Sequence, residues 1–170
     1  MKKNWIKLLT FLLGILISDI SYGQVRVYNN DKTFSFIPLD NWENFSKDNE
    51  LTFAQPLDNV SDIFRENIKI SVSPANGMKL DELWNSYVLI DFPKSFENFK
   101  IIQMWNSKIN EKDVKWIEFT NYKSEIKFRS LIYMLVENDK MYFIVCLALD
   151  IDFEKTEKSF LEMVNSFETN

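Results

Sequence analysis

The sequence predicts an α+β domain: an antiparallel β-sheet flanked by two main helices, forming an α/β/α sandwich. Three observations predict this class. Short alternating strand patterns come first along the chain, and an amphipathic helical pattern follows them. Four longer strand patterns then succeed one another with only short polar connections, which is typical of an antiparallel meander. A second amphipathic helical pattern closes the chain, and such a helix needs a sheet face to cover its apolar side.

Residues 1–23 predict a cleavable secretory signal peptide. A start with three lysines is followed by an apolar stretch over residues 8–17, which Asp19 closes. This stretch is about half of the ~20 residues that a membrane-spanning helix needs, so cleavage is favoured over an uncleaved anchor. No cysteine follows the stretch, so the lipid-attachment signal of a lipoprotein is absent. Cleavage after Gly23 would leave residues 24–170 as a single domain.

Export would leave an acidic protein in the periplasm or the medium. Removing residues 1–23 from the 170 leaves 147 residues with 17 basic and 24 acidic side chains, a net charge of −7. Basic and acidic residues are interspersed, without a basic stripe. We therefore expect no binding to nucleic acid or to anionic membrane surfaces. No second apolar stretch is long enough to span a bilayer, so we expect no stable membrane anchor after cleavage. The length is sufficient for a packed core.

The first half of the mature chain reads as short strands that end in a helix. The strands are expected at 25–28, 33–37, 50–54 and 67–73, and the last shows a clean alternation of apolar and polar residues. Trp42 falls in a loop after the second strand, and a polar loop covers residues 56–65. Apolar residues recur at helical spacing from Leu80, and this helix should stop by Phe92, because Pro93 disfavours helical geometry before it.

The second half reads as the meander followed by the closing helix. The last strand is apolar on both faces, so it should be central and covered on both sides. The final helix should begin at Asp150 or Asp152 as a cap and run to about Phe167. The expected strands of the meander are 99–109, 114–122, 126–136 and 141–149.

Much common catalytic machinery is missing from the sequence. The chain has no histidine, which removes the commonest general base, the histidine-dependent nucleophile systems and nearly all zinc sites. Gly77 is the only glycine after residue 23, so phosphate-cradling and dinucleotide-binding loops cannot be built. The lone cysteine, Cys146, lies in an apolar run and is expected in the core. We therefore expect no cofactor and no enzymatic activity.

Carboxylates keep two alternatives open, a carboxylate-dependent hydrolase and a calcium-binding domain. Asp150, Asp152 and Glu154 form the best local cluster, and their spacing resembles the start of a calcium loop. The glycine and the distal glutamate of such a loop are absent. Capping of the final helix explains the three acids more simply.

The tryptophans are the other candidates for a binding site. Trp84 falls on the apolar stripe of the first helix and Trp116 alternates within a strand, so both are expected in the core. Trp105 is open to either interpretation. Trp42 is the candidate binding residue, because it falls in a loop. A pocket or apolar patch near Trp42 and the loop of residues 56–65 would support that choice.

Three stretches of the sequence stand out beside the order of the elements: Phe34-Ser-Phe-Ile-Pro38 with Trp42 behind it, the strand 67–72 leading into the helix start 80–83, and the closing segment 160–167. Together with that order, they resemble the PsbP/Mog-like superfamily, including its exported bacterial members of the DcrB type. The glycines usual in the family's hairpins are replaced here by Asn, Asp and Lys. The resemblance implies an antiparallel sheet sandwiched by helices and a non-enzymatic, accessory or partner-binding role. It carries over no catalytic residues.

The favoured hypothesis is an exported accessory module without catalytic activity, whose partner is another envelope or secreted protein. One alternative is a carrier of a small apolar ligand, which the Phe-rich composition suggests and which would need an internal cavity of a few hundred Å³. The hydrolase or calcium-binding domain is the other alternative.

Overall fold

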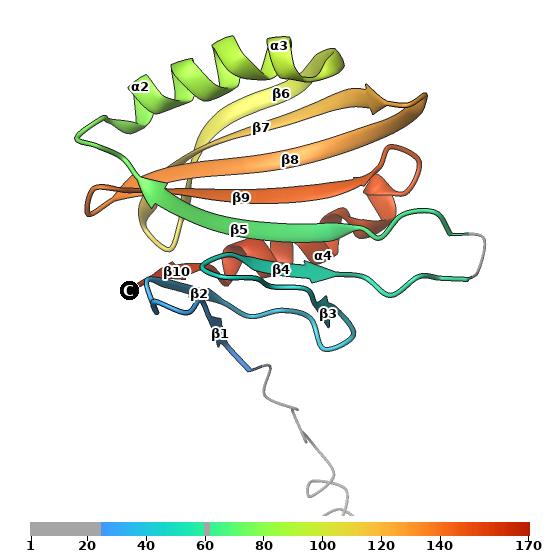
Figure 1. Ribbon diagram of the computed structural model, residues 1–170, viewed down its shortest axis with the longest axis horizontal. Helices are drawn as coiled ribbons and strands as arrows, with labels where there is room; N and C mark the ends of the chain where they lie inside the picture. The colour runs from blue at the N-terminus through green and yellow to red at the C-terminus, as the bar shows by residue number, and fades with distance from the viewer. Residues whose placement is uncertain (1–24, 60–61) are drawn as a thin grey trace, which may run out of the picture.

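The structure is a computed structural model that describes residues 25–59 and 62–170. The expected signal peptide, residues 1–23, lies outside the described residues and stays a prediction. The described part is an α+β fold with two helical layers on an antiparallel sheet (Figure 1). This confirms the fold class that the sequence predicts.

The main sheet has seven antiparallel strands in the order β3-β4-β5-β9-β8-β7-β6. The last four strands along the chain form the expected meander. β9 is the middle strand of the seven, as its two apolar faces predict. The bounds are β3 (Glu43–Asn44), β4 (Leu51–Ala54), β5 (Asn67–Pro74), β6 (Glu97–Ile109), β7 (Lys112–Lys123), β8 (Ile126–Glu137) and β9 (Lys140–Leu149).

A small second sheet joins the two ends of the described chain. It has the order β1-β2-β10, with β1 (Val27–Tyr28), β2 (Phe34–Phe36) and β10 (Glu168–Thr169). The sequence predicts the first two strands, but it gives no signal for a two-residue strand after the final helix. Arg26 adds to this closure, because its guanidinium donates to the carbonyl of Ser166 at 3.0 Å.

The hairpins of the meander turn without glycine. Each two-residue loop has both residues at positive φ, between 46° and 69°: Asn110–Glu111, Ser124–Glu125 and Asn138–Asp139. Such turns match the twist of the strands they join, and glycine or asparagine usually fills them. A glutamate at positive φ strains the backbone, since its Cβ crowds the carbonyl oxygen.

Two helical layers cover opposite faces of the sheet (Figure 1). One face carries α2 (Leu80–Trp84), a π-helical segment η1 (Asn85–Asp91) and α3 (Phe92–Ser95). The helical segment therefore runs past the expected stop at Phe92, and that prediction is wrong. Pro93 sits in the first turn of α3, where its missing N–H is not needed.

Helix α4 (Phe153–Asn165) covers the other face. It ends two residues before the expected Phe167 and leads into β10. Asp152 occupies the N-cap position, as predicted, but its side chain makes no capping hydrogen bond. Met163 belongs to the buried stripe of α4, whereas Leu161 is 37% exposed.

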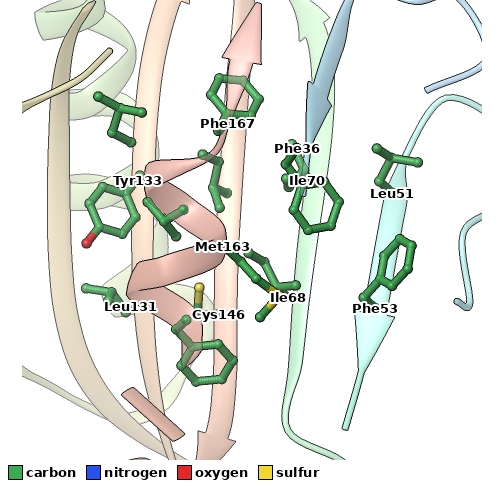
Figure 2. Packing of buried hydrophobic residues seen from close by; sticks show 14 of the residues in the cluster. Phe36, Leu51, Phe53, Ile68, Ile70, Leu131, Tyr133, Cys146, Met163 and Phe167 are labelled. Carbon is green, nitrogen blue, oxygen red and sulfur yellow. The ribbon is translucent and has the colours of Figure 1, made fainter. Parts of the chain in front are cut away.

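The core is divided by the sheet into two apolar clusters. The larger lies between the sheet, α4 and the small β1-β2-β10 sheet, and Figure 2 shows ten labelled side chains from it. Cys146 is fully buried there, as its apolar run predicts. The smaller cluster lies under α2, η1 and α3. Among the residues that the structure describes, no helix is long and apolar enough to span a bilayer.

Candidate functional site

Trp42 lies in the larger core cluster. It is 7% exposed and meets Phe160 of α4 edge-to-face, with ring centroids 5.8 Å apart. As a binding residue it stays a prediction. Trp84 is buried, as expected, and Trp116 packs half-buried against the larger cluster.

Trp105 is the exposed tryptophan among the described residues, at 66%. It lies on β6, the edge strand of the seven-stranded sheet, and its register partner on β7 is Trp116. Trp116 in turn packs on Tyr133 of β8, with ring centroids 6.1 Å apart. An aromatic row thus runs from the buried interior of the sheet outward to the edge.

Strand β6 is exposed along nearly its whole length of 13 residues. Three further apolar side chains, Ile101, Ile102 and Met104, are between 37% and 46% exposed. Exposed apolar edges are uncommon, because unpaired N–H and C=O groups there invite pairing with another chain. The edge of β6 therefore needs an explanation.

Register shifts divide β6 into two parts. They fall between Glu97 and Lys100 and between Ile101 and Gln103, and residues 103–109 then pair regularly with β7. We call the regular stretch, residues 103–109, the β6 edge. Lys108 stands in it, and Lys100 precedes it, so the exposed apolar residues lie between two basic side chains.

A second candidate site is an open pocket of about 640 Å³ on the sheet face that carries α3. Phe119, Ser130 and Leu147 line its floor from β7, β8 and β9. The pocket exists because α3 ends at Ser95, before the helical layer reaches the far end of the sheet. Phe96 and Phe64 form its walls. We call it the aromatic pocket, and its size lies within the range of ligand pockets.

Two buried polar side chains lie in the aromatic pocket. Ser130 is 4% exposed, and its hydroxyl has no hydrogen-bond partner in the described part of the chain. Asn121 is 8% exposed, and its amide nitrogen makes one long contact of 3.4 Å with the carbonyl of Tyr122. The two side chains are diagonal neighbours on one sheet face, since Ser130 pairs with Phe119 in register.

The candidate acids for calcium binding or hydrolysis, Asp150, Asp152 and Glu154, do not converge on one site. Asp150 pairs with Lys127 at 2.8 Å, and Glu154 pairs with Arg129 at 2.7 Å. Asp152 instead lines a cleft of about 270 Å³ with Asp58, Asp62 and Glu66. Within residues 25–59 and 62–170, no three such side chains are close enough to hold a metal ion.

Burial raises the pKa of the Glu66 carboxyl, although hydrogen bonds from backbone N–H groups oppose the shift. Sequence patterns gave no sign of this cleft, because its acids come from a loop, from the residue before β5 and from the N-cap of α4. Lys155 pairs with Asp58 at 2.6 Å across it.

A charged cluster ties α4 to the sheet below it. Glu118 of β7 is 2% exposed at its side chain and binds Arg129 of β8, while Gln103 donates to its second oxygen at 2.6 Å. Arg129 reaches on to Glu154 and stacks over Phe153 of α4, 4.3 Å from the ring centre. Burial disfavours the charge on Arg129, but its hydrogen bonds to both glutamates outweigh burial and raise its pKa. The members of the cluster bind one another across β7, β8 and α4, which indicates a structural role.

The sequence matches the family model for PsbP over residues 23–169. The chain belongs to the PsbP family. The resemblance that the sequence suggested is thereby confirmed. No curated protein sequence is close enough to count as a match.

Solved structures confirm the PsbP-like fold. Cyanobacterial PsbP (CyanoP) from Synechocystis sp. PCC 6803 has a TM-score of 0.60 at 9% identity, covering 91% of this chain and 99% of that one. LpqN of Mycobacterium tuberculosis, described as involved in cell envelope biogenesis, scores 0.68 at 9% identity and covers 86% and 90%. The protein Mog1 scores 0.59 at 9% identity and covers 85% and 95%. These identities establish the fold alone.

Proposed function

We propose that this PsbP-family protein is exported to the periplasm or the medium, where it acts as an accessory protein that binds another envelope or secreted protein. Two features of the sequence support the proposal: residues 1–23 look like an export signal, and the rest of the chain has no histidine and one glycine. The observation that carries it is the exposed β6 edge with Trp105 on it.

The mode of binding that fits this edge is addition of a strand. An extended segment of the partner would pair with the unpaired main-chain groups of residues 103–109, and main-chain hydrogen bonds would supply much of the affinity. Trp105 would supply specificity, because buried aromatic side chains carry a large share of the energy in interfaces. The preceding register shifts restrict pairing to this stretch, which prevents open-ended association.

The charges around the edge indicate the chemistry of the partner segment. Lys100 and Lys108 flank the exposed residues Met104 and Trp105, and Lys108 is only partly neutralised by Asp113, whose side chain is 84% exposed. An apolar segment with acidic residues at its ends therefore suits the edge better than a basic one.

The experiment is capture of a defined partner from an envelope extract of the source organism by the mature chain, compared across two variants. Trp105→Glu places a charge at the centre of the edge. Ile151→Glu is the matched control, because Ile151 is 86% exposed and lies after β9, away from β6. We expect the same partner with wild type and with Ile151→Glu, and its loss with Trp105→Glu.

Two results would count against the proposal. One is a partner that Trp105→Glu retains as well as wild type does. The other is a concentration-dependent dimer of the purified chain that Trp105→Glu abolishes, which would make the occupant of the edge a second copy of this protein.

A further inference from the structure

The aromatic pocket has the features of a small-molecule site and is separate from the β6 edge. Its volume of about 640 Å³ is large enough for a small molecule. Its floor is buried, since Phe119 is fully buried and Ile132 is 3% exposed. Phe64 meets Phe128 edge-to-face with ring centroids 5.1 Å apart, so Phe64 closes one wall of the pocket. Phe96 forms the opposite wall and packs on Phe119 with centroids 5.3 Å apart.

The polar groups on the floor point to a ligand with one polar function. A ligand that covered the Ser130 hydroxyl without bonding to it would leave that hydroxyl buried without a partner, at a cost of about 1–3 kcal/mol. No described buried polar atom is sealed off without a hydrogen-bond partner, so the Ser130 oxygen is still reached from the pocket. Asn121 is the diagonal neighbour of Ser130 on the same sheet face. Its side-chain carbonyl oxygen is free to accept a hydrogen bond, and its amide nitrogen makes only one long contact.

Charge on the ligand is disfavoured. The side chains of the floor are uncharged, and the charged residues that line the pocket, Glu97 and Lys123, are exposed and of opposite sign. A charged group carried to the floor would lose its hydration without an ionic partner there.

We propose that the aromatic pocket binds a small neutral amphiphile, with a flat apolar body between Phe64 and Phe96 and one hydroxyl, amide or aromatic amine that bonds to Ser130 and Asn121. The ligand lies against β7, β8 and β9 on the α3 face. The proposal goes beyond partner binding, and it stands or falls independently of the β6 edge.

The test uses N-phenyl-1-naphthylamine, a neutral aromatic probe with one N–H, whose fluorescence rises when it leaves water. We expect saturable binding to the mature chain with a Kd on the order of micromolar. Ser130→Ala should weaken binding by about 3- to 10-fold, the effect of one neutral hydrogen bond. Ser130→Leu, which fills the floor, should weaken it by more than about tenfold.

Two variants serve as controls. Ser71→Leu makes the same change on β5, outside the pocket lining, and should leave the affinity unchanged. Trp105→Glu should also leave it unchanged, because the probe does not use the β6 edge. A loss of probe binding in Trp105→Glu, with full binding in Ser130→Leu, would overturn the proposal.

Amide chemical shifts of the labelled wild-type chain give a readout that does not depend on folding of a variant. Saturation with the probe should shift residues 119–121, 128–132 and 145–147. Shifts confined to other strands, or no saturable shift, would refute the site.

Discussion

Loss of the Glu118 carboxylate should destabilise the protein strongly, because it leaves Arg129 without its buried partner. Glu118 is 2% exposed at its side chain, and Arg129 is 18% exposed. Removing one member of a buried pair costs about 3–5 kcal/mol in well-buried cases. Arg129 keeps Glu154 and some contact with water, so we expect Glu118→Ala to cost about 3 kcal/mol, at the lower end of that range.

Urea unfolding followed by circular dichroism measures this cost. With a slope of about 1–3 kcal/mol per molar urea, a loss of 3 kcal/mol lowers the midpoint by roughly 1–3 M. Glu154→Ala is the matched control: its side chain is 72% exposed, and exposed pairs are worth less than about 1 kcal/mol. The double variant Glu118→Leu with Arg129→Met should be more stable than Glu118→Ala, because it leaves no charge buried.

The reasoning would be refuted if Glu118→Ala cost no more than Glu154→Ala. It would also fail if the double variant were as unstable as the sum of its single changes, since interacting partners must show a coupling energy.

Three further predictions concern pH, a turn and the thiol. Burial alone would raise the pKa of Glu137, but hydrogen bonds from Lys112 and Thr169 outweigh it and hold that pKa below the ordinary value of 4.5. Glu137 therefore stabilises the fold above pH 4.5 and loses this effect as pH falls through its lowered pKa, so the deficit of Glu137→Gln in unfolding free energy should shrink on acidification. Glu111→Gly should raise the unfolding free energy by about 1 kcal/mol, because φ is +66° there; equal or lower stability in urea would contradict this. Burial raises the pKa of the Cys146 thiol, so a thiol reagent should label it only in denaturant, and rapid labelling of the native chain would disprove its burial.

Periodicity predicted the elements whose pattern of apolar residues can be buried in only one kind of surroundings. The two apolar faces of β9 could only be satisfied at the centre of a covered sheet, and β9 is the central strand. The end of the first helix was mispredicted, because the rule for proline assumes an unbroken α-helix. The π-helical η1 lets Pro93 begin a new turn. A strand as short as β10 has no pattern to detect.

The candidate sites were harder to predict from the sequence, because each depends on where a helix ends or where the sheet has its edge. The aromatic pocket arises from the end of α3 at Ser95, which leaves Ser130 uncovered on the sheet face. Trp105 alternates like Trp116, and its exposure follows from β6 being an edge, which the strand order alone reveals. Trp42 falls in a loop, yet the loop turns it onto α4.

The central claim, that a partner adds a strand to the β6 edge, is tested most directly by amide hydrogen exchange of the mature chain with and without its captured partner. The outer edge of β6 is unpaired in the described structure, so its free amides should exchange fast in the isolated chain. We expect the exchange of amides within residues 103–109 to slow by at least about tenfold in the complex, while amides near Ile151 keep their rates. Unchanged exchange along β6, with protection elsewhere, would contradict it.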